Sequence, residues 1–180
     1  MSKLENFIRR LTFRHQEPIS LYRCIKGGFK GMVTILLLSL FTKHGGVKLL
    51  MAPFGASCIL IYTTPQDEFA QPINIVGGYF IAGLVSLTLV EILPHDWWTV
   101  SLMLWFTITL MAIFRVTHPP AGAVPIVIYF ARMTMSFWYL AFPILIGSIL
   151  LVGIALLVHR IPPPRTYPRL LSDDSETSER

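Results

Sequence analysis

Residues 120–129 read PAGAVPIVIY, and they repeat the earlier segment PFGASCILIY at residues 53–62 with an offset of 67 positions. Six of the ten aligned positions are identical, including the Pro-x-Gly-Ala start and the final tyrosine. An apolar composition explains matching isoleucines, but it does not explain a matching Pro-x-Gly-Ala. Lys48 and Arg115 align at the same offset. The pattern predicts an internal repeat, in which each half contains one apolar segment broken by proline and glycine.

Six apolar segments surround and include this repeat, at approximately residues 27–42, 47–63, 72–92, 98–114, 119–131 and 137–158. A helix needs about 20 residues to cross the hydrocarbon core of a bilayer. The third and sixth segments are long enough, the first and fourth are long enough with their flanks, and the second and fifth are short and interrupted. Apolar residues make up 53% of the 180 residues, and the mean hydropathy is +0.60. The sequence therefore predicts an all-α polytopic membrane protein with a transmembrane domain at 27–158.

Two topologies fit the six segments. If every segment crosses, the halves at about 27–92 and 98–158 each cross three times and form an inverted repeat, a common transporter design. If the two broken segments are re-entrant, the chain crosses four times and the halves run parallel. Both topologies place the two termini on the same side. We expect six crossings, with the four-crossing arrangement as the alternative.

The N-terminal segment, residues 1–26, is basic, and the first 30 residues hold seven basic groups against two acidic ones. This excess is typical of a cytoplasmic terminus. A nucleic-acid partner is not expected, because no recognition module accompanies the charge. One helical face carries four apolar residues, Leu4, Phe7, Ile8 and Leu11. This face predicts a helix that lies on the membrane surface or packs against the protein.

The sequence also bears on the cellular location of the protein and on the state of its cysteines. No signal-peptide cleavage site follows the first apolar run, and the preceding segment is too poor in serine for a plastid transit peptide. We therefore expect a prokaryotic cytoplasmic (inner) membrane with both termini cytoplasmic. Residues 159–180 are proline-rich and then acidic and serine-rich, which predicts a flexible cytoplasmic tail. Cys24 and Cys58 are predicted to be free thiols, and no metal or cofactor motif is present.

The stretches THPPAGA (117–123) and KLLMAPFGAS (48–57) each predict a helix start. Prolines fit the first turn of a helix, where their missing N–H is no loss. A helix start presents N–H groups and a positive dipole end, which attract an anion. Two starts that face each other predict a site for a small anion; the alternative is that these residues only kink helices for packing. The predicted pathway residues are Pro53, Phe54, Gly55, Ala56, Ser57, Asn74, Thr117, His118, Pro119, Pro120, Ala121, Gly122 and Ala123.

Polar residues near these starts have predicted roles. His118 is a titratable group beside a membrane segment, where such residues often mark pathways or proton relays. The alternative is an interfacial or capping histidine. Lys48 and Arg115 are predicted at the pathway mouth, with snorkelling to headgroups as their alternative. Asn74, in the first turn after Gln71-Pro72, is a candidate for facing the polar site.

Three stretches resemble the HPP family of integral membrane proteins, named for its His-Pro-Pro motif: APFGAS (52–57), AQPINIVGG (70–78) and THPPAGA (117–123). They occur in the family's order and at its spacing, and the resemblance covers about residues 25–158. Tyr79 departs from the family's pattern, in which a smaller polar residue or histidine often follows the Gly-Gly pair. The resemblance implies four membrane-spanning helices. Because some plant and cyanobacterial members are associated with nitrite transport, it also implies a small-anion transporter or channel.

The predicted function is passive or proton-coupled permeation of a small monovalent anion, with nitrite as the leading candidate. One alternative is a non-transporting scaffold or sensor that acts through partners, and another is a pore for water or a small neutral solute. A polar path past His118 would favour permeation, and tight apolar packing there would favour a scaffold. We expect no enzyme, because no nucleophile, metal set or carboxylate cluster accompanies His118. Small residues at close-packing spacing favour a homo-oligomer, and the other expected partners are membrane lipids and the anion.

Overall fold

The computed structural model describes residues 3–13, 18–45, 49–131, 138, 140–160 and 167–169, and every regular element in them is a helix. The elements are α1 (Lys3–Thr12), α2 (Leu21–Gly45), α3 (Ala52–Thr63), η1 (Glu68–Ala70), α4 (Pro72–Ile92), α5 (Thr99–Ile113), η2 (Pro119–Ala123), α6 (Val124–Ala131), η3 (Leu140–Ile146) and α7 (Gly147–His159). The elements η1 and η2 are 3₁₀-helices, and η3 is π-helical. The predicted all-helical class is confirmed.

Three helices are long and apolar enough to cross a membrane: Leu21–Gly45, Pro72–Ile92 and Leu140–His159. Three shorter apolar helices accompany them: Ala52–Thr63, Thr99–Ile113 and Pro119–Ala131. Each of the six predicted apolar segments therefore contains a helix. The fifth and sixth segments each contain two consecutive helices of different type, because η2 continues into α6 and η3 continues into α7.

Proline sets several helix boundaries. It occupies the first or second position of α3, α4 and η2, where no N–H is needed for the helix. Pro143 lies inside η3. An internal proline removes an N–H and crowds the preceding turn, and the wider π-helical turn is one way to accommodate that disruption.

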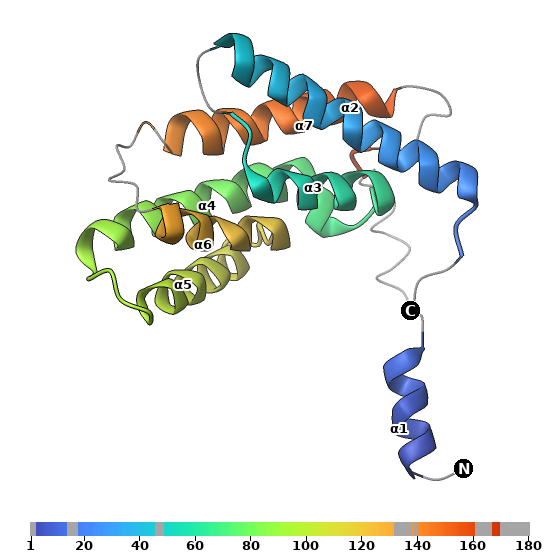
Figure 1. Ribbon diagram of the computed structural model, residues 1–180, viewed down its shortest axis with the longest axis horizontal. Helices are drawn as coiled ribbons and strands as arrows, with labels where there is room; N and C mark the ends of the chain where they lie inside the picture. The colour runs from blue at the N-terminus through green and yellow to red at the C-terminus, as the bar shows by residue number, and fades with distance from the viewer. Residues whose placement is uncertain are drawn as a thin grey trace.

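The helices form two groups that meet along α4 and α7 (Figure 1). In one group α2 packs on α3 and α7, and in the other α5 packs on α6 and α4. Figure 1 shows that α3 and α6 run in opposite directions, as do α4 and α7. The start of α3 packs on η2, so the two predicted helix starts lie together at the centre of the body.

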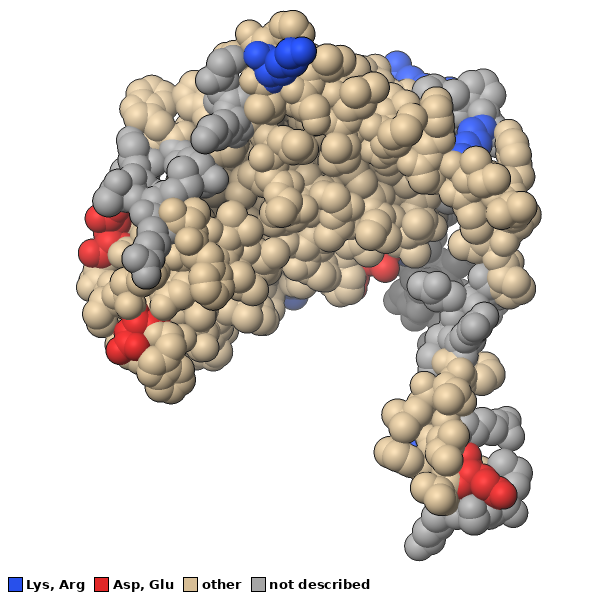
Figure 2. All heavy atoms as spheres, viewed as in Figure 1, with Lys and Arg blue, Asp and Glu red and all other residues tan. Residues whose placement is uncertain are grey.

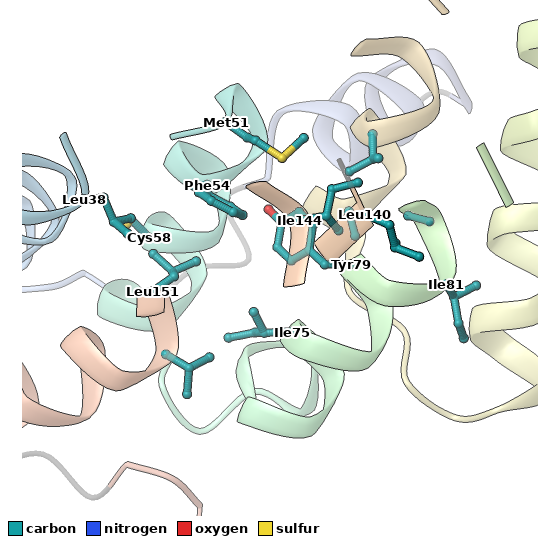
Figure 3. Close-up of a cluster of buried hydrophobic side chains, with 14 of the residues drawn as sticks. Leu38, Met51, Phe54, Cys58, Ile75, Tyr79, Ile81, Leu140, Ile144 and Leu151 are labelled. Carbon is teal, nitrogen blue, oxygen red and sulfur yellow. The ribbon is translucent and has the colours of Figure 1, made fainter. Parts of the chain in front are cut away.

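The core between the groups is apolar and tightly packed. Figure 3 shows Tyr79 of α4 reaching the space beside Phe54 of α3 and Ile144 of η3, and all three are fully buried. A Cβ on Gly147 would lie 2.8 Å from both the Leu49 carbonyl oxygen and the Phe54 ring. Glycine at this position therefore allows α7 to approach the start of α3.

The outer surface of the body is also apolar. The exposed face of α2 carries large apolar side chains, among them Phe29, Met32 and Leu36. Figure 2 shows a broad surface without charged side chains, with Lys, Arg, Asp and Glu at its edges. An exposed apolar surface of this extent fits contact with lipid and would be a liability in water.

The two ends of the chain differ in how they relate to the body. Helix α1 projects from it (Figure 1), with its four apolar residues exposed: Leu4, Phe7, Ile8 and Leu11. Within the tail predicted to be flexible, His159 is the last residue of α7. The Tyr167 hydroxyl donates to the Ala70 carbonyl at 3.0 Å, and the Arg169 N–H donates to Gln71 Oε1 at 2.9 Å. Tyr167 and Arg169 are thus docked on the body.

Candidate functional site

Ser57, Tyr79 and His118 meet at the centre of the molecule, although they come from α3, α4 and the segment before η2. Ser57 Oγ lies 2.8 Å from Tyr79 Oη and 2.7 Å from His118 Nε2. All three side chains are fully buried. The structure therefore joins three hydrogen-bonding side chains among the apolar residues of the core.

The partner of the second ring nitrogen fixes the tautomer of His118. Nδ1 lies 2.7 Å from the Phe69 carbonyl oxygen, which can only accept. Nδ1 therefore carries a hydrogen, and in the neutral ring Nε2 is an acceptor. The Ser57 hydroxyl then donates to Nε2 and the Tyr79 hydroxyl donates to Ser57. The hydrogen bonds therefore all run in one direction: Tyr79 donates to Ser57, Ser57 donates to His118, and His118 donates to the Phe69 carbonyl.

Two glycines let α4 lie directly against the backbone that precedes η2. A Cβ on Gly78 would lie 2.7 Å from His118 Cβ and 3.1 Å from the Val116 carbonyl oxygen. A Cβ on Gly77 would lie 3.0 Å from Val116 Cβ. The first distance is closer than packed carbon atoms approach. The Gly-Gly pair therefore has a steric role, because it brings Tyr79 within reach of Ser57 while leaving room for His118.

The turn that supplies the Phe69 carbonyl is held by its own polar groups. Asp67 Oδ1 accepts from the Phe69 N–H at 2.9 Å. Gln71 Nε2 donates to the carbonyls of Pro65 and Asp67 at 3.0 and 2.8 Å. Asn74, predicted as a candidate for the polar site, donates instead to the Glu68 carbonyl at 2.8 Å. These bonds stabilise the position of the carbonyl that orients His118.

The two helix starts offer a positive dipole end but few free N–H groups. Neither Met51 nor His118, the residues before α3 and η2, caps its helix with a side chain. The Phe54 N–H already donates to the Met51 carbonyl at 3.0 Å, and the Ala121 N–H donates to the His118 carbonyl at 2.9 Å. The prolines between them have no N–H. Donors for an anion would therefore come mainly from side chains and less from backbone than the sequence suggests.

The other predicted pathway residues separate into three groups. Buried ones are Pro53, Phe54, Pro120 and Ala121, and half-buried ones are Asn74, Thr117, Gly122 and Ala123. Gly55, Ala56 and Pro119 are exposed, so the structure does not bring them to the buried cluster. Arg115, predicted at the pathway mouth, is exposed and has a left-handed backbone with φ 55°. Lys48 lies outside the described residues.

Sequence reasoning missed a second polar cluster near the end of α3. Tyr62 is hydrogen-bonded to Thr34 of α2, and its ring stacks on His159 of α7 at 5.2 Å. Lys30, one turn before Thr34, is buried. The matching tyrosine of the repeat, Tyr129, stacks on His95 at 4.2 Å. The matching tyrosine at the end of both repeat segments was the signal that could have pointed to this pairing.

Comparison with known proteins identifies a family and two relatives. The family model described as HPP, transmembrane region, matches residues 16–168. A transmembrane protein of Dictyostelium discoideum is 27% identical over 128 residues, which covers 68% of this chain and 45% of that protein. A second one is 27% identical over 125 residues, covering 66% of this chain and 40% of that protein.

The chain spans less than half the length of these curated relatives. No solved structure matches it. The family match nevertheless includes α2 to α7, the Ser57–Tyr79–His118 cluster and the docked Tyr167. Together with the His-Pro-Pro segment at the centre of the fold, this match establishes that the chain belongs to the family of membrane proteins defined by the HPP transmembrane region.

Proposed function

We propose that this protein is a transporter or channel for a small monovalent anion, with nitrite as the leading candidate. The observation that carries the proposal is the fully buried cluster of Ser57, Tyr79 and His118 beside the two helix starts. Polar and ionisable groups are costly inside a membrane domain, and they commonly mark a substrate or proton path. Two hydroxyls and an imidazole, close to the positive ends of α3 and η2, are the groups that would replace part of an anion's hydration.

We further propose that the six apolar segments all cross the membrane as an inverted repeat. Support comes from equivalent contacts in the two halves: α2 packs on α3 and α7 as α5 packs on α6 and α4. Corresponding helices run in opposite directions in Figure 1. The tyrosine that ends each repeated segment stacks on a histidine: Tyr62 stacks on His159 at the end of α7, and Tyr129 stacks on His95 in the loop after α4. Broken helices that meet near the midplane are a usual place for a transport site.

The membrane and its orientation belong to the same proposal. The basic N-terminal segment supports a cytoplasmic N-terminus, and in the six-crossing arrangement the C-terminus lies on the same side. A prokaryotic inner membrane stays a prediction, and the relatives reported above come from a eukaryote. We expect no enzymatic activity.

A second candidate is a membrane scaffold or sensor that does not transport. It is favoured by the packing of His118, which is fully buried with both ring nitrogens hydrogen-bonded to the protein and with Gly78 against its Cβ. A pore for water or a neutral solute is a variant of the first candidate, because hydroxyl groups also bind neutral molecules.

Nitrite entry into proteoliposomes tests the proposal, with empty liposomes as the measure of nitrous acid leak. Ser57→Ala removes the central hydroxyl, and we expect uptake to fall about tenfold or more, because a buried hydrogen bond to a charged group contributes about 1.5–3 kcal/mol. Ser86→Ala is the matched control, since Ser86 is equally buried but donates to the Ala82 carbonyl of its own helix at 2.6 Å.

The outcomes separate the candidates. Uptake that falls in Ser57→Ala and persists in Ser86→Ala supports an anion site at the cluster. If both variants take up nitrite equally, the protein still transports nitrite, but the Ser57–Tyr79–His118 cluster has no part in that transport. No uptake above the leak by folded protein counts against nitrite transport and favours the scaffold, whereas solute-driven swelling without anion uptake favours the neutral pore.

A further inference from the structure

The hydrogen bonds at the cluster leave no hydroxyl hydrogen for an anion while His118 is neutral. The Tyr79 hydroxyl donates to Ser57, the Ser57 hydroxyl donates to His118 Nε2, and Nδ1–H donates to the Phe69 carbonyl. Each of these three hydrogens has an acceptor inside the protein. An anion needs donors, so it would have to compete with Nε2 for the hydrogen of Ser57.

A proton on Nε2 changes the direction of one bond. The imidazolium must donate from both nitrogens, and the acceptor 2.7 Å from Nε2 is Ser57 Oγ. Ser57 then accepts from both His118 and Tyr79, and its own hydrogen is released. Among the described residues the remaining acceptor near Ser57 is the Pro53 carbonyl at 3.4 Å, which is a long hydrogen bond. Protonation therefore creates a positive charge and a donor in the same place.

The groups around His118 do not supply a counter-charge in the part of the chain that the structure describes. Ser57 faces it from α3, and Tyr79 faces it from α4. From η1 the facing group is the Phe69 carbonyl, while Asp67 bonds the Phe69 N–H and Glu68 is exposed. On its own segment Arg115 is exposed. A buried imidazolium without a counter-charge is costly, and a monovalent anion would provide that charge.

We propose that the anion occupies this site together with one proton, which is held on Nε2 of His118, so that the protein moves a proton and an anion together with no net charge. The inference rests on the proposed transport function and adds its coupling ion. Binding is reciprocal, so the proton strengthens anion binding and the anion strengthens proton binding by the same factor. The Tyr79 hydroxyl contacts Ser57 Oγ at 2.8 Å and so helps to hold Ser57 beside His118.

Charge movement in proteoliposomes tests the coupling. With the leak into empty liposomes subtracted, we expect nitrite entry to acidify the lumen and its rate to be unaffected by a potassium diffusion potential. Lowering the external pH by one unit should raise the initial rate up to tenfold while His118 is mainly neutral. A rate that follows the membrane potential without luminal acidification would show anion uniport and overturn the inference while the transport function stands. Absence of any uptake would overturn the transport function itself.

Calorimetry on the purified wild-type protein gives an answer that does not depend on a variant. Nitrite is titrated in buffers of different ionisation enthalpy, and the dependence of the heat on that enthalpy counts the protons taken up. We expect about one proton for each bound nitrite, and a value near zero overturns the coupling.

In His118→Asn, whose amide can still donate to the Phe69 carbonyl, we expect no proton uptake and residual transport that follows the membrane potential. Proton uptake retained by this variant would assign the proton to another group.

Discussion

At the scale of single residues, His118 shows how a short motif acquires its geometry. Its ring nitrogens are satisfied by Ser57 and by the Phe69 carbonyl, 61 and 49 residues away along the chain. The two prolines that follow it start η2 without needing donors, so they leave His118 in extended backbone, where its ring reaches both partners. The residue that allows this packing is Gly78, because a Cβ there would overlap His118.

Gly78→Ala tests that steric role. The added methyl would lie 2.7 Å from His118 Cβ, and the neighbouring Val116 backbone cannot move without shifting η2. We expect a loss of about 1–3 kcal/mol in the free energy of unfolding, as is usual for overpacked sites, seen as a lower thermal midpoint in detergent. Gly153→Ala in α7 is the control, because nothing lies within 4 Å of its Cβ. If the two variants have the same thermal midpoint, α4 does not approach His118 as closely as the structure shows.

At the scale of elements, the turn from residue 64 to 71 connects the cluster to the C-terminal residues. Its 3₁₀-helix η1 presents the Phe69 carbonyl to His118 on one side and the Ala70 carbonyl to Tyr167 on the other. The Tyr167 ring also stacks on His159 at 4.7 Å. Burial raises the pKa of Tyr167, so its hydroxyl keeps its hydrogen and remains a donor at neutral pH. The docked residues therefore stabilise the turn that orients His118.

Tyr167→Phe removes this donor and keeps the ring. We expect a loss of about 0.5–1.5 kcal/mol, the usual net contribution of one hydrogen bond. The loss should be local, so the measurement is amide hydrogen exchange by mass spectrometry over residues 64–71, which we expect to be faster in the variant. Tyr22→Phe is the control, since Tyr22 is exposed at the start of α2. Unchanged exchange in the turn would mean that the tail does not support it.

At the scale of the whole molecule, the paths of the helices bear on the proposed six crossings. In Figure 1 the end of α3 and the start of α4 lie on the side where α2 begins, and the end of α4 lies on the opposite side. That path fits a short helix that continues across the membrane rather than one that returns. It also places the starts of α3 and η2 together between the two sides.

Cysteine accessibility tests this path. In a Cys24→Ser background, which keeps the buried Cys58, one cysteine at a time is added at Pro18, Glu68 or Pro94, all of which are exposed. In the six-crossing arrangement a membrane-impermeant maleimide reaches the Pro18 and Glu68 positions from one side and the Pro94 position from the other. The four-crossing arrangement predicts the reverse pairing, with the Pro94 position on the same side as Pro18 and the Glu68 position opposite. The Pro18 variant is the internal reference for the N-terminal side.

The sequence by itself determined the membrane class, the six apolar helical segments and the proline-marked helix starts. These depend on composition and on local backbone chemistry, which act over a few residues. Only the tertiary structure decided which polar groups meet. Helices α3 and α4 are apolar on all sides, so no periodic pattern indicates which face of each helix points inward. The sequence therefore could not predict that Ser57 and Tyr79 both face the core. In a membrane protein the core and the lipid are both apolar, and the rotation of each helix is therefore set by packing, here by the close approach at Gly78 and Gly147.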